Sequence, residues 1–385
     1  MEPTELFEII SRDEDGKHQF KADVRNVDSL AGEMVAFSNS AGGQIFIGVT
    51  NGGQVAGLTR DDMGRLNQLI SNVASQSVRP PINPQTENVA LPDGLVMVVT
   101  ILPGISKPYM DNNGAIWVKS GSDKRKVTSR EELQRMYQSA GLIHGDEVLT
   151  NGMTSGDLDM DYFRDFFEKQ YGESLETQEL PLNTILENMN LMKDGILNIA
   201  GALLFAKTLE FRLPVFCVKC VCYPGNDIHA SEYRDSEDIS GKIEELFSRS
   251  FSFITRNLRR IQDDKNVNSL GELEIPRISL EELLANALVH RDYFILAPIR
   301  VFIFDDRIEI ISPGHLPNNL TIVNIKNGNS NIRNPILTSF ATKILPYRGL
   351  GNGVRRALKE YPDIDFADDR EGNMFKVIIR RRESQ

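Results

Sequence analysis

Residues 279–292 read SLEELLANALVHRD. Their apolar positions recur at helical spacing, which places Glu282 and Asn286 four residues apart on one helix face. Magnesium binds oxygen ligands and keeps positions for phosphate, so this face suits a magnesium ligand beside a general base. A solvated helix face without chemistry is the alternative that this block alone leaves open.

A glycine-rich loop follows nearer the C-terminus. Residues 348–353 read RGLGNG and precede the helical pattern VRRALKEY. Backbone N–H groups in such a loop, together with the positive end of the helix, bind phosphate. Between the two blocks, residues 299–314 predict a strand pair that ends in a glycine turn. Helices followed by antiparallel strands predict an α+β layer, in which the helix and the loop converge on one face.

This order of elements resembles the ATP-binding core shared by gyrase, Hsp90, histidine kinases and MutL, the GHKL ATPases. The strings ALVHRDY, FDDRIEIISPGHLP, IRNP and GLGNG more closely resemble the RecG-C-terminal-related ATPase domain of predicted transcriptional regulators, over about residues 158–382. The resemblance implies a divergent GHKL-like α/β sandwich that binds ATP and Mg²⁺. Glu282 is then the general base, and Asn286 is the magnesium ligand. The implied nucleotide-binding residues are Asn286, Asp292, Gly314, Gly349, Gly351 and Gly353.

The glycine turn departs from the wider superfamily, which carries an aspartate there to read the adenine amino group. In this chain Ser312 precedes Pro313 and Gly314. Serine is a weaker, neutral partner for adenine. The sequence leaves both ATP binding alone and weak ATPase activity open.

Residues 1–140 predict a separate α/β unit. Strands at 18–24 and 44–50 flank a helix at 29–43, and two further strands are expected at 95–102 and 115–121. A last helix begins at Ser129, which with Glu132 has the spacing of a capping box.

The motifs HQFKADV, AFSNSAGGQIFIGVTNGGQVAGL and WVKSGSDKRKVTSREEL resemble the Schlafen-type AlbA_2 domain, also called divergent AAA-4, over about residues 16–136. The resemblance implies binding of DNA or RNA and, in some Schlafens, RNA cleavage by a carboxylate cluster. This chain has Gln19 where that family usually has glutamate, and Thr50-Asn51 at its next acidic position. Glu14 and Asp15 alone make a poor metal site. Binding is therefore expected, and a metal-dependent nuclease is the alternative.

The net negative charge of the chain limits how it can bind nucleic acid. The chain has 43 Lys+Arg against 54 Asp+Glu and a net charge of −11, so binding requires a local basic patch. Cations that cluster around the predicted strand end and turn form the candidate patch: Lys21, Lys119, Lys124, Arg125, Lys126 and Arg130. A solvated turn balanced by nearby acids is the competing interpretation.

The predicted organisation has four parts. Residues 1–140 form the AlbA_2-like domain, 141–156 a linker, 157–277 a middle region of helices and strands, and 278–385 the ATPase-like domain. No basic leader or long apolar stretch appears, so a cytoplasmic protein without membrane contact is expected. The leading hypothesis is a nucleic-acid-binding regulator, in transcription control or anti-phage defence, and the family resemblance adds a homo-oligomer. A degenerate oligomeric scaffold is a further alternative.

Overall fold

The computed structural model describes residues 1–229, 232–261, 271–317 and 320–381. It divides the chain into two compact units, Met1–Leu142 and Ile143–Gln385, which we call the first and the second unit. Among the described residues, no helix has the length and apolar character needed to cross a membrane.

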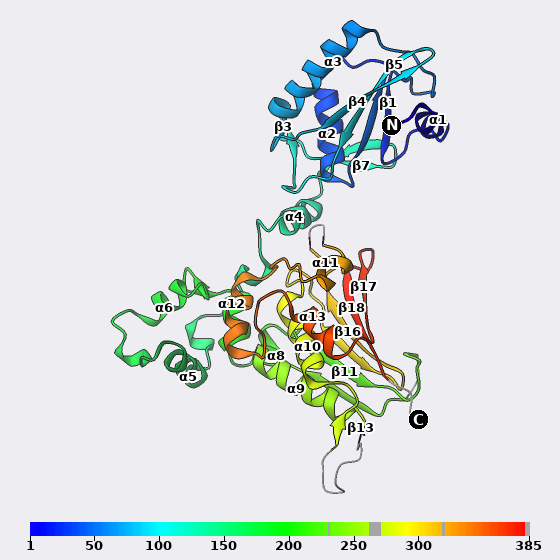
Figure 1. Cartoon of the computed structure of the whole chain (residues 1–385). Coiled ribbons are helices and arrows are strands. Elements are labelled where there is room, and N and C mark those ends of the chain that lie inside the picture. Colours follow the sequence, from blue (N-terminus) through cyan, green and yellow to red (C-terminus); the bar gives the residue numbers. More distant parts are fainter. Residues whose placement is uncertain (230–231, 262–270, 318–319, 382–385) are drawn as a thin grey trace. The chain divides into compact units, whose positions relative to one another are not determined.

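The first unit is built on a mixed four-stranded sheet with the strand order β1-β2-β5-β4 (Figure 1). Its strands are β1 (His18–Lys21), β2 (Gly43–Ile47), β4 (Gln85–Leu91) and β5 (Gly94–Ile101). The parallel pair β1 and β2 is joined through a helix, whereas the other pairs are antiparallel. The helices are α1 (Pro3–Ile10), α2 (Val27–Asn39), α3 (Arg60–Asn72), the π-helical turn Val73–Ser77 and α4 (Arg130–Ser139). Two short pairs complete the unit: β3 (Val78–Arg79) with β6 (Met110–Asp111), and β7 (Trp117–Ser120) with β8 (Asp123–Lys126).

Alternation along the strands gives this sheet two apolar faces. Ile45 and Ile47 belong to the cluster that packs under α2 and α3, whereas Phe46 between them packs with Leu6 and Ile10 of α1. Successive side chains on a strand point to opposite faces, so one strand serves both cores. The first unit is therefore an α/β arrangement with helices on each side of the sheet.

The second unit contains a six-stranded sheet with the order β12-β11-β15-β16-β18-β17. Its strands are β11 (Val218–Cys222), β12 (Asp235–Ile239), β15 (Ile299–Ile303), β16 (Arg307–Pro313), β17 (Ile364–Asp369) and β18 (Met374–Arg380). Only the β11–β15 pair within this sheet is parallel. The short pairs are β9 (Met192–Lys193) with β10 (Ile196–Leu197), and β13 (Arg260–Ile261) with β14 (Glu272–Leu273).

Helices cover one face of the six-stranded sheet, where α9, α10 and α13 lie together (Figure 1). The helices of this unit are α5 (Met160–Tyr171), α6 (Leu182–Asn188), α7 (Ile199–Phe205), α8 (Leu209–Arg212), α9 (Ile243–Arg256), α10 (Arg277–His290), α11 (Ile322–Lys326), α12 (Pro335–Ile344) and α13 (Gly353–Glu360). Short 3₁₀ turns are Gly145–Glu147, Ser155–Asp157 and Leu175–Thr177. Phe302, Phe304 and Ile311 form a smaller cluster apart from the main core. The predicted α/β architecture is thus observed in both units.

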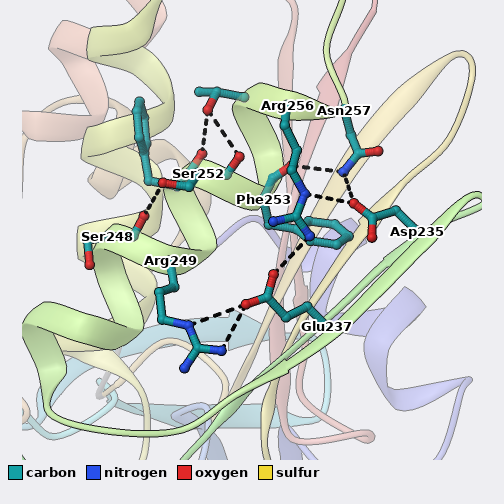
Figure 2. A network of polar contacts seen from close by, with 10 residues as sticks. Asp235, Glu237, Ser248, Arg249, Ser252, Phe253, Arg256 and Asn257 are labelled. Carbon is teal, nitrogen blue, oxygen red and sulfur yellow. Dashed lines mark hydrogen bonds and ion pairs between the residues drawn. The ribbon is translucent and has the colours of Figure 1, made fainter.

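Helix α9 is fixed to the edge strand β12 by a polar network (Figure 2). Arg256 donates from Nε to Asp235 and from Nη2 to Glu237, each at 2.8 Å. Arg249 donates to Glu237 at 2.9 Å, and Asn257 donates to Asp235 at 2.8 Å. Because the acids alternate along β12, both point toward the helix and their charges are neutralised there.

The structure differs from the predicted linker at residues 141–156. The division between the units falls after Leu142, and Asp146 is fully buried in the second unit, where its Oδ2 accepts from the backbone N–H of Leu337 at 2.9 Å. Burial raises the pKa of Asp146 to about 6. Residues 143–156 therefore belong to the second unit, and Asp146 anchors them there, which the Gly- and Thr-rich composition did not indicate.

The predicted border between residues 157–277 and 278–385 also differs from the structure. Strand β11 from the first of these parts pairs with β15 from the second, in the same sheet. The two parts share one large apolar core. They form one compact unit.

Candidate functional site

A pocket of the second unit lies between α10, the glycine turn after β16 and the loop before α13. Glu282 and Asn286 of α10 line it, as do the four glycines expected there, Gly314, Gly349, Gly351 and Gly353. Apolar side chains from the neighbouring elements complete the wall, among them Leu283, Leu316, Ile325, Phe366 and Val377. The structure thus brings the predicted helix face and both glycine segments to one cavity.

Glu282 and Asn286 are in contact, as their spacing predicts. Asn286 Nδ2 donates to the backbone oxygen of Glu282 at 2.7 Å and to its Oε1 at 3.2 Å. The Glu282 residue is only 3% exposed. Because the amide nitrogen of Asn286 is turned toward Glu282, its Oδ1 is the atom left for a cation, and a hard cation such as Mg²⁺ takes oxygen ligands.

Arg356 of α13 completes this cluster, although no motif in the sequence pointed to it. Its Nη2 forms an ion pair with Oε2 of Glu282. A buried carboxylate requires such a partner, because a single uncompensated charge away from water is costly. The charge of Glu282 is therefore matched inside the protein.

The loop before α13 lies close against this carboxylate. Gly349 and Gly351 have φ angles of +67° and +71°, in the left-handed region that favours glycine. Gly353 begins α13, and a Cβ added there would overlap with Oε1 and Cδ of Glu282 and lie 2.9 Å from its Cγ. The carboxylate of Glu282 thus lies at the position where the helix start and the loop were expected to meet phosphate.

The glycine turn forms another wall of the pocket. Gly314 has a φ of +98°, and an added Cβ would lie 2.5 Å from Cβ of Asp292 and 2.6 Å from Nη1 of Arg333. The Ser312 hydroxyl donates to the backbone oxygen of Ala287 at 3.2 Å, so it is engaged with α10. Among the described residues that line the pocket, Glu282 is the only carboxylate.

Asp292, also expected at the nucleotide, lies behind Gly314 and not in the pocket wall, so its contact with a nucleotide stays a prediction. It does not line the pocket, and its Oδ1 accepts from the backbone N–H of Phe294 at 2.9 Å. The reason is that α10 ends at His290, so Asp292 falls in the following turn, where its carboxylate holds the backbone.

His290, Tyr347 and Arg333 also line the pocket and add polar groups that carry no negative charge. His290 Nε2 lies 2.9 Å from the hydroxyl of Tyr347. Burial, assisted by the charge of Arg333, lowers the pKa of His290 to about 4. Burial and the charge of Glu282 raise the pKa of Tyr347 to about 12. Both side chains are therefore neutral at pH 7 and can offer hydrogen bonds to a ligand.

The basic patch predicted in the first unit is largely neutralised within the protein. The Lys119 side chain is 4% exposed, and its Nζ donates to Gln19 Oε1 at 2.9 Å. Lys124 forms an ion pair with the buried Glu33 at 3.1 Å. Arg125 holds Glu132 through two hydrogen bonds at 2.7 and 2.9 Å. Lys119 and Lys124 are thus turned toward acceptors of the same unit and are largely covered, whereas the Arg125 side chain is paired but 49% exposed. A phosphate contact by these three residues stays a prediction.

The remaining members of the predicted patch are more accessible. Lys126 at the end of β8 and Arg130 at the start of α4 are exposed, and Lys21 is half-buried. Glu14, considered as a nuclease carboxylate, accepts from the backbone N–H of Phe20 at 2.6 Å and from Gln19. Within the described ranges, no group of three His, Cys, Asp or Glu side chains is arranged to hold a metal ion.

Two regions of the chain, one in each unit, match known protein families. Residues 14–128 match the family described as "Schlafen, AlbA_2". Residues 297–379 match the family described as "Putative ATP-dependent DNA helicase recG C-terminal". The motif-based assignment of the two regions is confirmed. The RecG C-terminal match contains the glycine turn and the loop before α13 but begins after α10, so it does not include Glu282 and Asn286.

Two solved structures resemble the chain weakly. The crystal structure of the DIP2311 protein from Corynebacterium diphtheriae is 19% identical, covers 98% of this chain and 80% of its own, and gives a TM-score of 0.48. A solution structure of the N-terminal domain of a RecG-related protein from Nitrosomonas europaea is 16% identical, covers 34% of this chain and 96% of its own, and gives a TM-score of 0.24. A comparison with curated proteins finds no significant match.

Proposed function

We propose that the second unit binds a nucleoside triphosphate, ATP with Mg²⁺, in the pocket beside α10. The observation that carries this proposal is the meeting of the Glu282–Asn286 face with the loop of Gly351 and Gly353 in one cavity. Asn286 Oδ1 would hold the metal ion, whose charge would offset that of the phosphates. Glu282 lies beside it as the group able to accept a proton from water. The match to the RecG C-terminal family supports the proposal.

Asn286→Ala is expected to abolish the contribution of Mg²⁺ to ATP binding. The substitution removes the amide oxygen and leaves the loop and the apolar wall in place. Calorimetry of ATP binding with Mg²⁺ and with EDTA, on wild type and variant, measures this contribution. The affinities in EDTA serve as the internal control and should agree. An unchanged gain from Mg²⁺ in the variant would contradict the ligand assignment.

We also propose that the first unit binds DNA or RNA and that the chain acts as a cytoplasmic regulator, in transcription control or anti-phage defence, that assembles as a homo-oligomer. The match to the Schlafen AlbA_2 family supports the nucleic-acid contact. Since Lys119 and Lys124 are engaged with largely covered partners and Arg125 is paired with Glu132 at the surface, we assign the phosphate contacts to Lys126, Arg130 and Lys21. Light scattering with and without ATP tests whether nucleotide changes the assembly.

Joint replacement of Lys126 and Arg130 by Gln is expected to weaken binding of labelled RNA and duplex DNA regardless of base sequence. Each lost phosphate contact lowers the slope of log affinity against log salt by roughly one, so a decrease of about two is expected. Fluorescence anisotropy across a salt series gives this slope. Arg125→Gln is the matched control, because Arg125 already pairs with Glu132. Equal losses from control and double variant would place the contact elsewhere.

A further inference from the structure

We propose that Arg356 recognises the terminal phosphate of the nucleotide and that Glu282 competes with this phosphate for the same guanidinium. The inference rests on the proposed function, because it concerns the same pocket. Arg356 is a residue that the motifs did not identify. Glu282 acquires a role in nucleotide binding, before any hydrolysis. The ligand class is then one that ends in a phosphate group.

The Glu282 carboxylate lies where a phosphate is expected. It is placed against Gly353, the first residue of α13, where the helix end favours an anion. Gly351 of the same loop also lines the pocket. A phosphate held by this loop would therefore lie close to the carboxylate.

The guanidinium of Arg356 has donor capacity left for a second anion. Arg356 lines the pocket, and its side chain is 30% exposed, whereas the paired Glu282 side chain is 4% exposed. Its Nε is buried and has no hydrogen-bond partner in the structure described. The ion pair with Glu282 thus leaves part of the donor capacity of this guanidinium unused, and another part faces the cavity.

The Glu282 carboxylate and a nucleotide phosphate are chemically alike as partners of arginine. A carboxylate and a phosphate both present pairs of oxygens that match the fork of an arginine. Two anions at one helix end repel each other, so the arginine cannot fully satisfy both. Phosphate binding at the loop therefore draws Arg356 away from Glu282 and leaves that carboxylate with Asn286.

Neighbouring arginines provide the comparison. Arg355 precedes Arg356 in α13 and is exposed, but it does not line the pocket, and its Cδ lies near Gly328. Arg348 lines the pocket from the loop and is exposed. Arg356 alone among these three forms an ion pair with a buried carboxylate in the structure described.

Binding of ATP, ADP and adenosine by the full chain, measured by calorimetry with Mg²⁺, tests the inference. Glu282→Gln removes the competing charge and keeps an acceptor for Arg356. We expect it to raise the affinity for ATP by roughly tenfold and to leave that for adenosine unchanged. Adding Arg356→Met to this variant should lower the ATP affinity by roughly tenfold or more, again without effect on adenosine. The double variant also avoids an unpaired buried charge, which the single Arg356→Met would leave.

Arg355→Met is the matched control for Arg356→Met, and Glu281→Gln is the matched control for Glu282→Gln. Each control makes the same change of charge one position earlier in the chain. Both should leave ATP affinity within about twofold of wild type. The inference would be overturned by a fall in ATP affinity in Glu282→Gln. It would also be overturned if Arg356→Met, added to Glu282→Gln, lost no more ATP affinity than Arg355→Met does. In either case, binding of ATP by wild type would still uphold the proposed function. A wild type that binds none of the three compounds would overturn both.

Discussion

Gly353→Ala is expected to weaken ATP binding by about ten- to a hundredfold. A methyl group at this position would overlap with the carboxylate of Glu282, which is buried and fixed by Arg356 and Asn286. Forcing an atom into a packed site costs roughly 1–3 kcal/mol, and each 1.4 kcal/mol is tenfold in affinity. Calorimetric titration with ATP and Mg²⁺ measures the loss.

Two further variants separate crowding from a general effect of the glycine substitution. Gly64→Ala makes the same change in α3, where an added Cβ would meet nothing within 4 Å, so ATP binding should be unchanged. Adding Glu282→Ala to Gly353→Ala removes the overlapping atoms and should restore binding in EDTA. If the double variant binds as poorly as Gly353→Ala, crowding against Glu282 is not the cause.

The candidate site shows which contacts helix periodicity can predict. Glu282 and Asn286 meet because a separation of four residues on one helix fixes their relation, whatever the rest of the chain does. Arg355 and Arg356 are adjacent and locally alike, and only the packing of α13 on α10 directs Arg356 to Glu282. Asp292 lies two residues past the end of α10, where helix periodicity no longer fixes a side chain's position, and it does not line the pocket.

The basic hairpin shows the limit of judging charge from local sequence. Lys119 and Lys124 lie close together in the chain, but the acid that neutralises Lys124 is Glu33, 91 positions away. Half of the predicted capping box of α4 is missing for a related reason. Ser129 accepts from the Glu132 backbone N–H, whereas the Glu132 carboxylate bonds Arg125.

The sheets were predictable where their strands are apolar. Strands β2, β5, β15 and β16 read as hydrophobic runs, and the structure contains them. The edge strands β4, β12 and β17 went unrecognised, because edge positions tolerate polar residues and their sequences QTENVAL, DSEDI and IDFADD carry little apolar alternation. Their pairing depends on the neighbouring strand.

Glu274→Ala is expected to lower the free energy of unfolding of the second unit by about 3–5 kcal/mol, the usual cost of removing one partner of a buried ion pair. Glu274 and Arg381 have side chains only 2% and 5% exposed, and two nitrogens of Arg381 donate to Glu274 Oε1 at 2.7 and 3.1 Å. Arg259 donates to the same carboxylate from its backbone and side chain. The variant would leave the Arg381 charge buried without its carboxylate.

Urea unfolding measures this loss with a control inside the same molecule. The single tryptophan, Trp117, lies in the first unit, so its fluorescence should keep its midpoint, whereas circular dichroism should show the second unit unfolding earlier. Asp365→Ala breaks the exposed pair with Arg380, whose side chains are 59% and 55% exposed, and should cost less than about 1 kcal/mol. Glu274→Met with Arg381→Met should recover most of the loss, because no single charge stays buried.

The pH dependence follows from the same contacts. Burial acts to raise the pKa of Glu274, but the hydrogen bonds and charges of Arg381 and Arg259 outweigh it, so the pKa is lowered. A carboxyl group with a lowered pKa stabilises the fold above the pKa of the unfolded chain, and this stabilisation disappears as the pH falls through the folded value. The difference in unfolding free energy between wild type and Glu274→Ala should therefore be full at pH 7 and shrink in acid. A difference that stays constant down to the acid transition would show that packing, and not the ionised carboxylate, accounts for the effect.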